Sequence, residues 1–298
     1  MFDLSGKVAL ITGSTKGIGK SIAEEMANAG AKVVISSRKA EACEEVTREF
    51  TGKGYEAISV PCNIAHKEQL QQLVDATMKH WGKIDVLVCN AAANPVYGPT
   101  AQAGDEVFDK IMNNNIKSNW WLCNMVIPQM AERKDGAVII ISSIAALKGN
   151  TVIGLYGVSK AADTALVRNY ACEWGPSNVR VNAILPGLVK TDFARALWEN
   201  EKARTAREAM TPLRRLGEAE EIGGRFQRDG AARVIAIEEA AILRPRVRAA
   251  ASRGGECGRE VPLLDVRRHA PRATGVARDQ QVALRPRHQR VRLVERDQ

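Results

Sequence analysis

Tyr156 and Lys160 stand four residues apart in a stretch with a helical pattern, so their side chains project from one face of the predicted helix. A phenol with an ordinary pKa of about 10 is a poor proton donor and acceptor near neutral pH. A neighbouring ammonium group stabilises the phenolate and lowers that pKa, which would make Tyr156 a usable general acid or base. Taken alone, such a pair is also common on exposed helices.

Ser143 precedes this pair in the chain and ends a predicted strand. Open α/β sheets bind their ligands at the carboxyl edge, where such a hydroxyl would lie. Taken alone, Ser143 is equally well an ordinary hydroxyl at a strand end, and Ser142 is its near-equivalent neighbour.

A glycine-rich turn follows the first predicted strand, Val8–Thr12, and leads at once into a helical pattern. A strand, a glycine turn and a helix N-terminus together form an anion site. Gly13 allows the tight turn, Gly17 lets the backbone approach a pyrophosphate, and Gly19 lets the helix pack closely on the strand. The turn predicts dinucleotide binding, the alternative being a structural turn without a ligand.

Apolar strands that alternate with amphipathic helices extend through the first 224 residues. The predicted strands are Val8–Thr12, Lys32–Ser36, Glu56–Val60, Val86–Asn90, Ala137–Ser142 and Arg180–Ile184. The predicted helices between them are Ile18–Ala29, Ala40–Phe50, Lys67–His80, Asp105–Met130 and Tyr156–Glu173. This order predicts a single α/β domain with a doubly wound, Rossmann-like parallel sheet. Strands that are apolar at consecutive positions indicate helices on both faces.

The spacing Gly-x-x-x-Gly-x-Gly in the turn resembles the short-chain dehydrogenase/reductase family, and so does the rest of the first 224 residues. Asn90-Ala91-Ala92-Ala93 stands where the family has Asn-Asn-Ala-Gly, with Cys89 and Ala93 as departures. Further matches, in the family's order, are Asn115, Ser143, Tyr156, Lys160, Pro186, Gly187 and Thr191. The resemblance covers roughly three quarters of the chain.

The resemblance implies hydride transfer between a nicotinamide cofactor and a carbonyl or alcohol substrate, without a metal. In this scheme Tyr156 moves the proton, Ser143 donates a hydrogen bond to the substrate oxygen, and Lys160 also holds the nicotinamide ribose. The family's spacing selects Ser143 over Ser142. Asn115 is expected to bind a water molecule behind Lys160, the alternative being an amide inside a helix that bonds to the backbone.

The end of the second predicted strand carries Ser37 and Arg38 where an acidic residue would favour NAD. Arg38 can bind a 2′-phosphate, and Lys16 adds a second cation, so we expect NADP(H) rather than NAD(H). The alternative is that both are solvated surface cations. Asn63 stands where the family has an aspartate that accepts a hydrogen bond from adenine. The predicted cofactor-binding residues are Gly13, Ser14, Thr15, Lys16, Gly17, Ile18, Gly19, Ser37, Arg38, Asn63, Asn90, Tyr156, Lys160, Pro186, Gly187 and Thr191.

Residues 188–210 match the family's mobile substrate lid in position. Leu197 and Trp198 are apolar enough to cover a pocket, and a plain core contact is the alternative for both. Asn94-Pro95, the stretch from Pro186 to Thr191 and Leu197-Trp198 most resemble the branch of NADP-dependent carbonyl and retinal reductases.

The composition is that of a globular protein: 298 residues, 45% of them hydrophobic and 26% charged, which argues against a disordered or collagenous chain. Its most apolar stretch is too short for a membrane span, and the N-terminus is unlike a signal peptide, so we expect a cytoplasmic protein. The six cysteines have no metal-type spacing with the four histidines and are expected to be reduced thiols.

Residues 225–298 depart from the family completely: they hold 17 arginines, no lysine and 9 acidic residues, and so carry most of the net charge of +9. This texture is typical of a shifted reading frame in GC-rich DNA, and we expect a poorly ordered basic tail. The alternative function is a nucleotide-binding fold whose tail binds nucleic acid or another polyanion, with little catalysis. No aromatic residue for base stacking follows Ala231. Relatives assemble partly through this C-terminal segment, which leaves a homo-oligomer in doubt.

Overall fold

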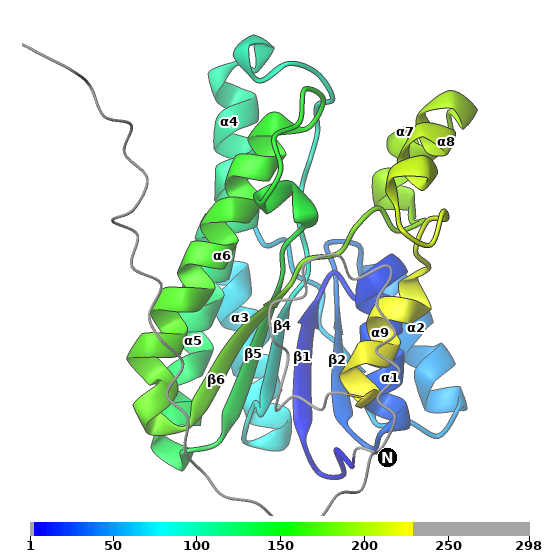
Figure 1. Cartoon of the computed structure of the whole chain (residues 1–298). Coiled ribbons are helices and arrows are strands. Elements are labelled where there is room, and N and C mark those ends of the chain that lie inside the picture. The colour runs from blue at the N-terminus through cyan, green and yellow to red at the C-terminus, as the bar shows by residue number, and fades with distance from the viewer. Residues whose placement is uncertain (1–2, 229–298) are drawn as a thin grey trace, which may run out of the picture. The chain divides into compact units, whose positions relative to one another are not determined.

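The computed structural model describes residues 3–228, which form a six-stranded parallel sheet (Figure 1). The strand order is β3-β2-β1-β4-β5-β6, and every pair is parallel. The strands are β1 (Val8–Thr12), β2 (Lys32–Ser36), β3 (Ala57–Ser59), β4 (Val86–Cys89), β5 (Gly136–Ile141) and β6 (Val179–Ile184). The predicted doubly wound fold is confirmed. The order reverses between β1 and β4, and such a switch point opens a crevice at the carboxyl ends of the strands.

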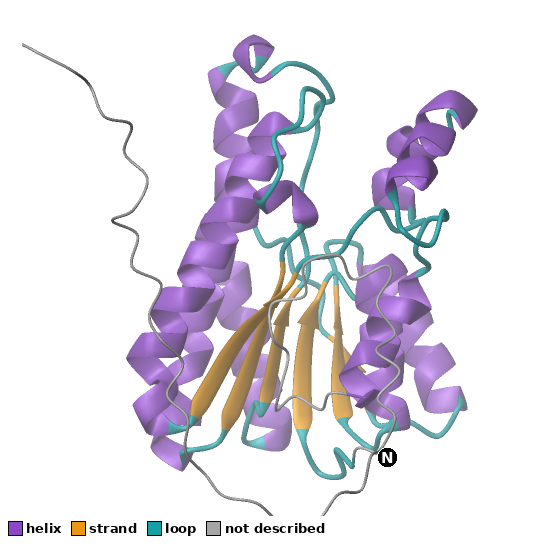
Figure 2. Cartoon of the chain, viewed as in Figure 1, coloured by secondary structure: helices purple, strands orange, loops and turns teal. Residues whose placement is uncertain are grey.

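Helices cover both faces of the sheet (Figure 2). Their bounds are α1 (Gly17–Asn28), α2 (Ala40–Gly52), α3 (Lys67–Trp81), α4 (Asp105–Met112), α5 (Ser118–Arg133), α6 (Gly154–Trp174), α7 (Arg195–Trp198), α8 (Glu201–Met210) and α9 (Ala219–Arg228). One apolar core joins α1, α2 and α9 to the sheet, and the other joins α3, α5 and α6 to its opposite face. Figure 1 shows α4 and the α7–α8 segment standing above the carboxyl ends of the strands.

Strand β1 shows why the strands are apolar at consecutive positions. Ile11 belongs to the core beneath α1, and the adjacent Leu10 belongs to the core beneath α5. Both side chains are fully buried, because successive side chains of a strand point to opposite faces of the sheet. Burial on both faces fixes the register of the strand, and with it the position of the glycine turn that follows.

One predicted helix is divided in the structure. The pattern predicted continuous helix over Asp105–Met130, but a π-helical turn at Asn113–Lys117 separates α4 from α5. The side chain of Asn115, within this turn, bonds to the backbone of Ala93, which accounts for the local change. Turns of this kind inside α-helices are frequent at functional sites.

Other predicted boundaries are close to the observed ones. Strand β3 is shorter at both ends than predicted, and α6 begins before Tyr156. Helix α9 continues to Arg228, past the predicted domain boundary at residue 224. Residues 229–298 lie outside the described part of the chain, so the basic, poorly ordered tail and the frame shift stay predictions. Within residues 3–228, β6 is the last strand of the sheet on its side.

Candidate active site

The glycine turn has the geometry of a phosphate cradle. Gly13 and Gly17 have φ angles of +69° and +54°, which favour glycine. A Cβ atom at Gly19 would collide with the carbonyl oxygen of Gly13, so the helix packs on the turn only without a side chain there. Helix α1 has no side-chain cap at Lys16, which leaves the N–H groups of its first turn for a ligand. These features fit the pyrophosphate of a dinucleotide.

Polar groups beside the turn hold it in place. The Asn90 side chain donates hydrogen bonds to the carbonyl oxygens of Thr12 (2.9 Å) and Gly13 (3.2 Å). The Thr12 hydroxyl in turn accepts from the backbone N–H of Asn90 at 3.0 Å. The buried Ser14 hydroxyl donates to Ile11 at 2.9 Å and accepts from the backbone of Ser36 at 2.9 Å. The structure therefore places the Ser14 hydroxyl in the scaffold of the turn.

The predicted adenosine side lies at the end of β2. Arg38 is exposed there, and the Ser37 backbone N–H contacts the sulfur of Cys43 at 3.1 Å. The Asn63 side-chain oxygen accepts from the N–H of Ala65 at 3.2 Å.

The ammonium of Lys16, within the glycine turn, forms an ion pair with a residue of the predicted lid. Its Nζ lies 3.2 Å from a carboxylate oxygen of Asp192, and both side chains are exposed. Asp192 begins a 3₁₀ turn within the predicted lid, directly after Thr191. The structure therefore links the glycine turn to the predicted lid through an ion pair.

Ser143 and Tyr156 meet at the carboxyl edge of the sheet. The Ser143 hydroxyl forms a hydrogen bond with the Tyr156 phenol, and it accepts one from the N–H of Ala145 at 3.1 Å. The Ser142 hydroxyl is buried and donates to the carbonyl of Lys160 at 2.8 Å. Ser143 is therefore the hydroxyl that lies beside the phenol.

Lys160 lies deep beneath Tyr156 and is 1% exposed. Its Nζ atom lies 5.7 Å from the centre of the Tyr156 ring, and it donates to the carbonyl of Ile141 at 2.9 Å. It also donates to Asp163, a fully buried carboxylate, at 2.9 Å. Sequence reasoning missed Asp163, although its place three residues after Lys160 puts both side chains on one helix face.

Burial is the largest single influence on the pKa values of Tyr156 and Lys160. Desolvation raises the pKa of Tyr156, the Lys160 ammonium lowers it, and the Asp163 carboxylate raises it further. The net shift is upward, whereas the sequence predicted a lowered pKa for Tyr156. Desolvation opposes the charge of Lys160, yet Asp163 and Tyr156 outweigh it and raise the pKa of Lys160.

Asn115 is fully buried and has every side-chain atom engaged. Its oxygen accepts from the N–H of Ala93 at 2.7 Å, and its nitrogen donates to the Ala93 carbonyl and to the Ser159 hydroxyl, both at 3.0 Å. Its backbone carbonyl accepts from Asn119 at 2.7 Å. These bonds match the second interpretation of Asn115, an amide inside a helix that bonds to the backbone. Its role in binding a water molecule behind Lys160 stays a prediction.

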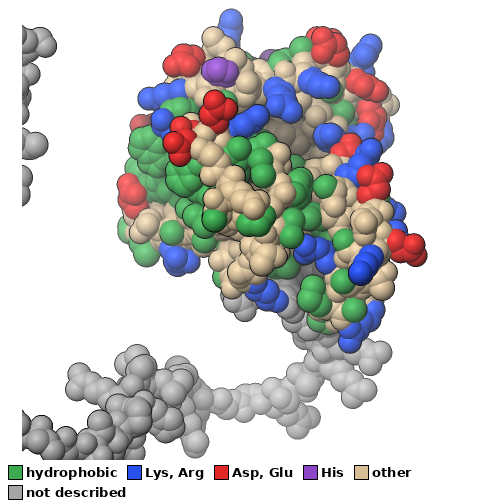
Figure 3. Space-filling model, turned by 90° about the horizontal axis from the view of Figure 1, so that it is seen from above, with side chains coloured by type: hydrophobic (Ala, Val, Ile, Leu, Met, Phe, Trp, Pro, Cys, Tyr) green, Lys and Arg blue, Asp and Glu red, His purple; other side chains and the backbone are tan. Residues whose placement is uncertain are grey.

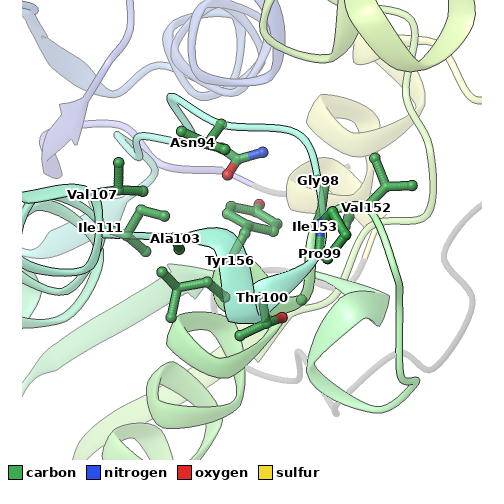
Figure 4. Close-up of a pocket in the computed structure, with 13 residues that line it drawn as sticks. Asn94, Gly98, Pro99, Thr100, Ala103, Val107, Ile111, Val152, Ile153 and Tyr156 are labelled. Atoms are coloured by element: carbon green, nitrogen blue, oxygen red, sulfur yellow. The ribbon is translucent and has the colours of Figure 1, made fainter. Parts of the chain in front are cut away.

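A small pocket opens beside Tyr156, between the loop after β4, α4 and the start of α6 (Figure 4). In Figure 4 the Tyr156 ring extends into the middle of the labelled residues. Its lining is mostly apolar: Asn94, Val96, Gly98, Pro99, Thr100, Ala103, Val107, Ile111, Val152, Ile153, Gly154, Leu155 and Tyr156. Figure 3 shows hydrophobic side chains gathered on one part of this end of the molecule. Walls of this kind favour an apolar group over a charged one.

The predicted lid approaches the pocket through residues other than those expected. The rings of Phe193 and Tyr156 are 6.1 Å apart, and the Tyr97 hydroxyl donates to the carbonyl of Phe193 at 3.3 Å. Trp198 instead donates from its ring nitrogen to the carbonyl of Thr191 at 2.9 Å. Neither Leu197 nor Trp198 is among the residues that line the pocket described above.

Known proteins resemble most of this chain in sequence. Residues 13–227 match the family model described as enoyl-(acyl carrier protein) reductase. The bovine dehydrogenase/reductase SDR family member 4 is 40% identical over 221 residues, covering 74% of this chain and 79% of that protein. The human dehydrogenase/reductase SDR family member 2, mitochondrial, is 39% identical with the same coverage. The chain belongs to the short-chain dehydrogenase/reductase family.

Solved structures of dehydrogenases superpose on about three quarters of the chain. A 7α-hydroxysteroid dehydrogenase complexed with NADH is 35% identical, with a TM-score of 0.70, and covers 75% of this chain and 86% of its own. A gluconate 5-dehydrogenase from Burkholderia cenocepacia in complex with NADP and tartrate is 28% identical, with a TM-score of 0.72. The match covers 75% of this chain and 88% of that protein's chain. The protein is an oxidoreductase that transfers a hydride between a nicotinamide cofactor and a carbonyl or alcohol substrate.

No helix within residues 3–228 is long and apolar enough to cross a membrane. The described residues also contain no cluster of side chains suited to holding a metal ion. A cytoplasmic location and the assembly of the chain into a homo-oligomer stay predictions.

Proposed function

We propose that the chain is an NADP(H)-dependent reductase of apolar carbonyl compounds, with Asn115, Ser143, Tyr156 and Lys160 as its catalytic set. The observation that carries the cofactor preference is the end of β2, where Ser37 and an exposed Arg38 follow the strand and no acidic residue stands between residues 36 and 39. A guanidinium binds a phosphate through two parallel hydrogen bonds, and no carboxylate repels the phosphate there.

The residues of the site divide the work of carbonyl reduction. The glycine turn and the first turn of α1 would hold the pyrophosphate, and when bound the nicotinamide supplies the hydride. Ser143 donates a hydrogen bond to the carbonyl oxygen and stabilises the charge that develops on it. Tyr156 transfers its proton to that oxygen, and the Lys160 ammonium stabilises the phenolate that remains. Lys160 uses two of its three N–H donors on Ile141 and Asp163, which leaves one for a ribose hydroxyl.

The apolar pocket beside Tyr156 supports the substrate class. Val107, Ile111 and Leu155 line it from α4 and α6, and the exposed side chains of Val96 and Val152 lie at its rim. A ketone or aldehyde with a hydrocarbon or aromatic body would bury that body here, with its oxygen toward Ser143 and Tyr156. This agrees with the branch of carbonyl and retinal reductases that the sequence motifs favour.

The cofactor preference is tested by measuring the dissociation constants of NADPH and NADH for the full chain. We expect tighter binding of NADPH, and Arg38→Asp should reverse the order because it removes a cation and adds a repelling charge. Arg48→Asp makes the same change of charge on the exposed side of α2 and should leave the order as it was. If the unaltered chain binds NADH as tightly as NADPH, the role of Arg38 is wrong.

The activity is tested with NADPH and a panel of ketones, aldehydes and diketones graded by apolar size. Turnover that rises with the apolar area of the substrate supports the proposal. Turnover confined to polyhydroxylated substrates would contradict the assignment of the apolar pocket.

A further inference from the structure

Asp163 is a buried acid whose position no step of the proposed mechanism requires. It lies on α6, one helical turn after Lys160, and its side chain is fully buried. One carboxylate oxygen accepts from Lys160 at 2.9 Å, and the other accepts from the Asn119 amide at 3.0 Å. Both oxygens are thus occupied by donors, which is the pattern of an ionised carboxylate. A buried ion pair is costly, so its presence beside the reacting groups calls for a role.

We propose that Asp163 is a positioning residue, whose carboxylate holds the Lys160 ammonium in place and keeps the Tyr156 phenol protonated between turnovers. The inference rests on the proposed function, in which Tyr156 is the proton donor. It adds that the free enzyme is prepared for carbonyl reduction, because the phenol reaches each turnover with its proton.

The charges around Tyr156 carry this argument. Without Asp163 the phenol would face one buried cation, which favours the phenolate. With Asp163 that cation is paired, and a second negative charge beside the ion pair is disfavoured. Tyr156 and Lys160 titrate as a coupled pair, and a nearby anion raises the pH at which the pair loses its first proton, whichever group releases it.

Neutral groups occupy the other elements that pack against the pair. Asn119 of α5 binds the carboxylate, and the Ile141 carbonyl of β5 binds the ammonium. Three more titratable groups lie near the pair: the Tyr97 phenol in the loop after β4, and the buried thiols of Cys89 on β4 and Cys123 on α5. A charge on Tyr97 would raise the pKa of Tyr156. The hydrogen bond that the Cys89 thiol donates to Cys123, together with desolvation, raises the pKa of Cys89, so this thiol stays uncharged at neutral pH. Asp163 is therefore the buried carboxylate that opposes the effect of the Lys160 ammonium on the pKa of Tyr156, and it acts in the same direction as desolvation.

A spectrophotometric titration tests the proposal without turnover. The phenolate absorbance of Tyr156 is obtained from pH 7 to 11 as the difference between each protein and its Tyr156→Phe counterpart. In Asp163→Asn we expect the phenolate at a pH about one to three units lower than in the unaltered chain, which is the shift a neighbouring charge produces. The basic limb of NADPH-dependent carbonyl reduction should move in the same direction.

Asp85→Asn is the matched control, because it neutralises another buried carboxylate away from Tyr156. It should lower the melting temperature and leave the phenolate titration in place. If Asp163→Asn does not fold, Asp163→Ser gives the same test with a smaller neutral side chain that leaves room for a water molecule beside Lys160. A phenolate titration that stays in place, or moves to higher pH, in the folded Asp163 variant would overturn the proposal.

The two proposals fail in different experiments. Full turnover in Tyr156→Phe would remove the acid/base role on which the proposed function rests. An unmoved phenolate titration in the Asp163 variant, with turnover lost in Tyr156→Phe, would remove the role of Asp163 alone.

Discussion

A lysine as deeply buried as Lys160 keeps its charge only if its neighbours replace the water that it has lost. Asp163 and the Ile141 carbonyl do so at 2.9 Å each. Tyr156 is buried in the same cluster, and desolvation raises its pKa by more than the Lys160 ammonium lowers it. Chemistry at a single residue is therefore decided by the charges of the whole buried cluster.

The acid/base role of Tyr156 gives a first prediction at this scale. Tyr156→Phe removes only the phenolic hydroxyl, so NADPH binding should stay within about twofold, while kcat falls by about 10² or more through loss of the proton donor. Steady-state kinetics and a binding titration on the same preparation measure the two effects. Lys160→Ala, as a comparison, should weaken both binding and turnover, since it removes a charge and a ribose contact. Turnover near that of the unaltered chain in Tyr156→Phe would refute the role.

The residues that sequence reasoning found are those whose spacing lies within one element. The four-residue spacing of Tyr156 and Lys160, and the glycines of the turn, are set by local geometry and are visible in the chain. The contact between Asn119 and Asp163 depends on how closely α5 approaches α6, which no local pattern encodes. The reversed shift of the Tyr156 pKa was missed for the same reason, because burial is a property of the packed molecule.

A second buried acid, Asp85, connects β1 and α5 at the amino ends of the strands, opposite the edge that carries the candidate active site. Its carboxylate accepts from the N–H of Val8 at the start of β1 at 2.8 Å. It also lies 3.0 Å from the ammonium of Lys83 and 3.5 Å from the guanidinium of Arg133 on α5. One side chain thus ties β1 to α5 and helps to set the strand that carries the glycine turn.

Loss of the Asp85 carboxylate should lower the stability of the fold. Asp85→Ala leaves the Val8 N–H buried without its acceptor, so the free energy of unfolding should fall by about 1 to 3 kcal/mol. Asp135→Ala removes a carboxylate from an exposed pair with Lys7 and should cost less than about 1 kcal/mol. Urea unfolding of both variants measures the difference. Equal losses of stability would mean that the bond from Val8 contributes little.

The helix pattern alone did not predict the π-helical turn at Asn113–Lys117. Apolar residues continue with helical spacing through the whole of α4 and α5, so the periodicity predicts one helix. The turn depends on the bonds between Asn115 and Ala93, residues on different elements that meet only after folding. The strands, in contrast, were predictable to within a residue or two, because their apolar runs are bounded by polar residues.

At the scale of the whole molecule, the described fold ends in α9, which packs closely on α1. A Cβ atom at Gly223 would collide with the side chain of Ser21 on α1, so the contact requires glycine. The family match extends to residue 227, within the same helix. The predicted boundary at residue 224 would therefore divide an element, and a truncation is better placed after Arg228.

The last quarter of the chain gives a prediction at this scale. If residues 225–298 result from a shifted reading frame, restoring the other frame near codon 224 should raise both the melting temperature and the turnover with NADPH. Thermal unfolding and kinetics of the two full chains make the comparison. The frame-shift hypothesis is wrong if residues 225–298 resist limited proteolysis and truncation after Arg228 abolishes folding. Loss of specific nucleic-acid binding on truncation would instead favour the polyanion-binding alternative.

The ion pair between Lys16 and Asp192 makes the site sensitive to the medium around it. Both side chains are exposed, so the pair contributes little to stability and is weakened by dissolved salt. An incoming phosphate competes with Asp192 for the same ammonium. Ionic strength therefore acts on cofactor entry in two opposing ways. It weakens the ion pair between Lys16 and Asp192, and it also screens the attraction of the cofactor for Lys16. The rate of entry should accordingly pass through a maximum as salt is added, rather than decline steadily.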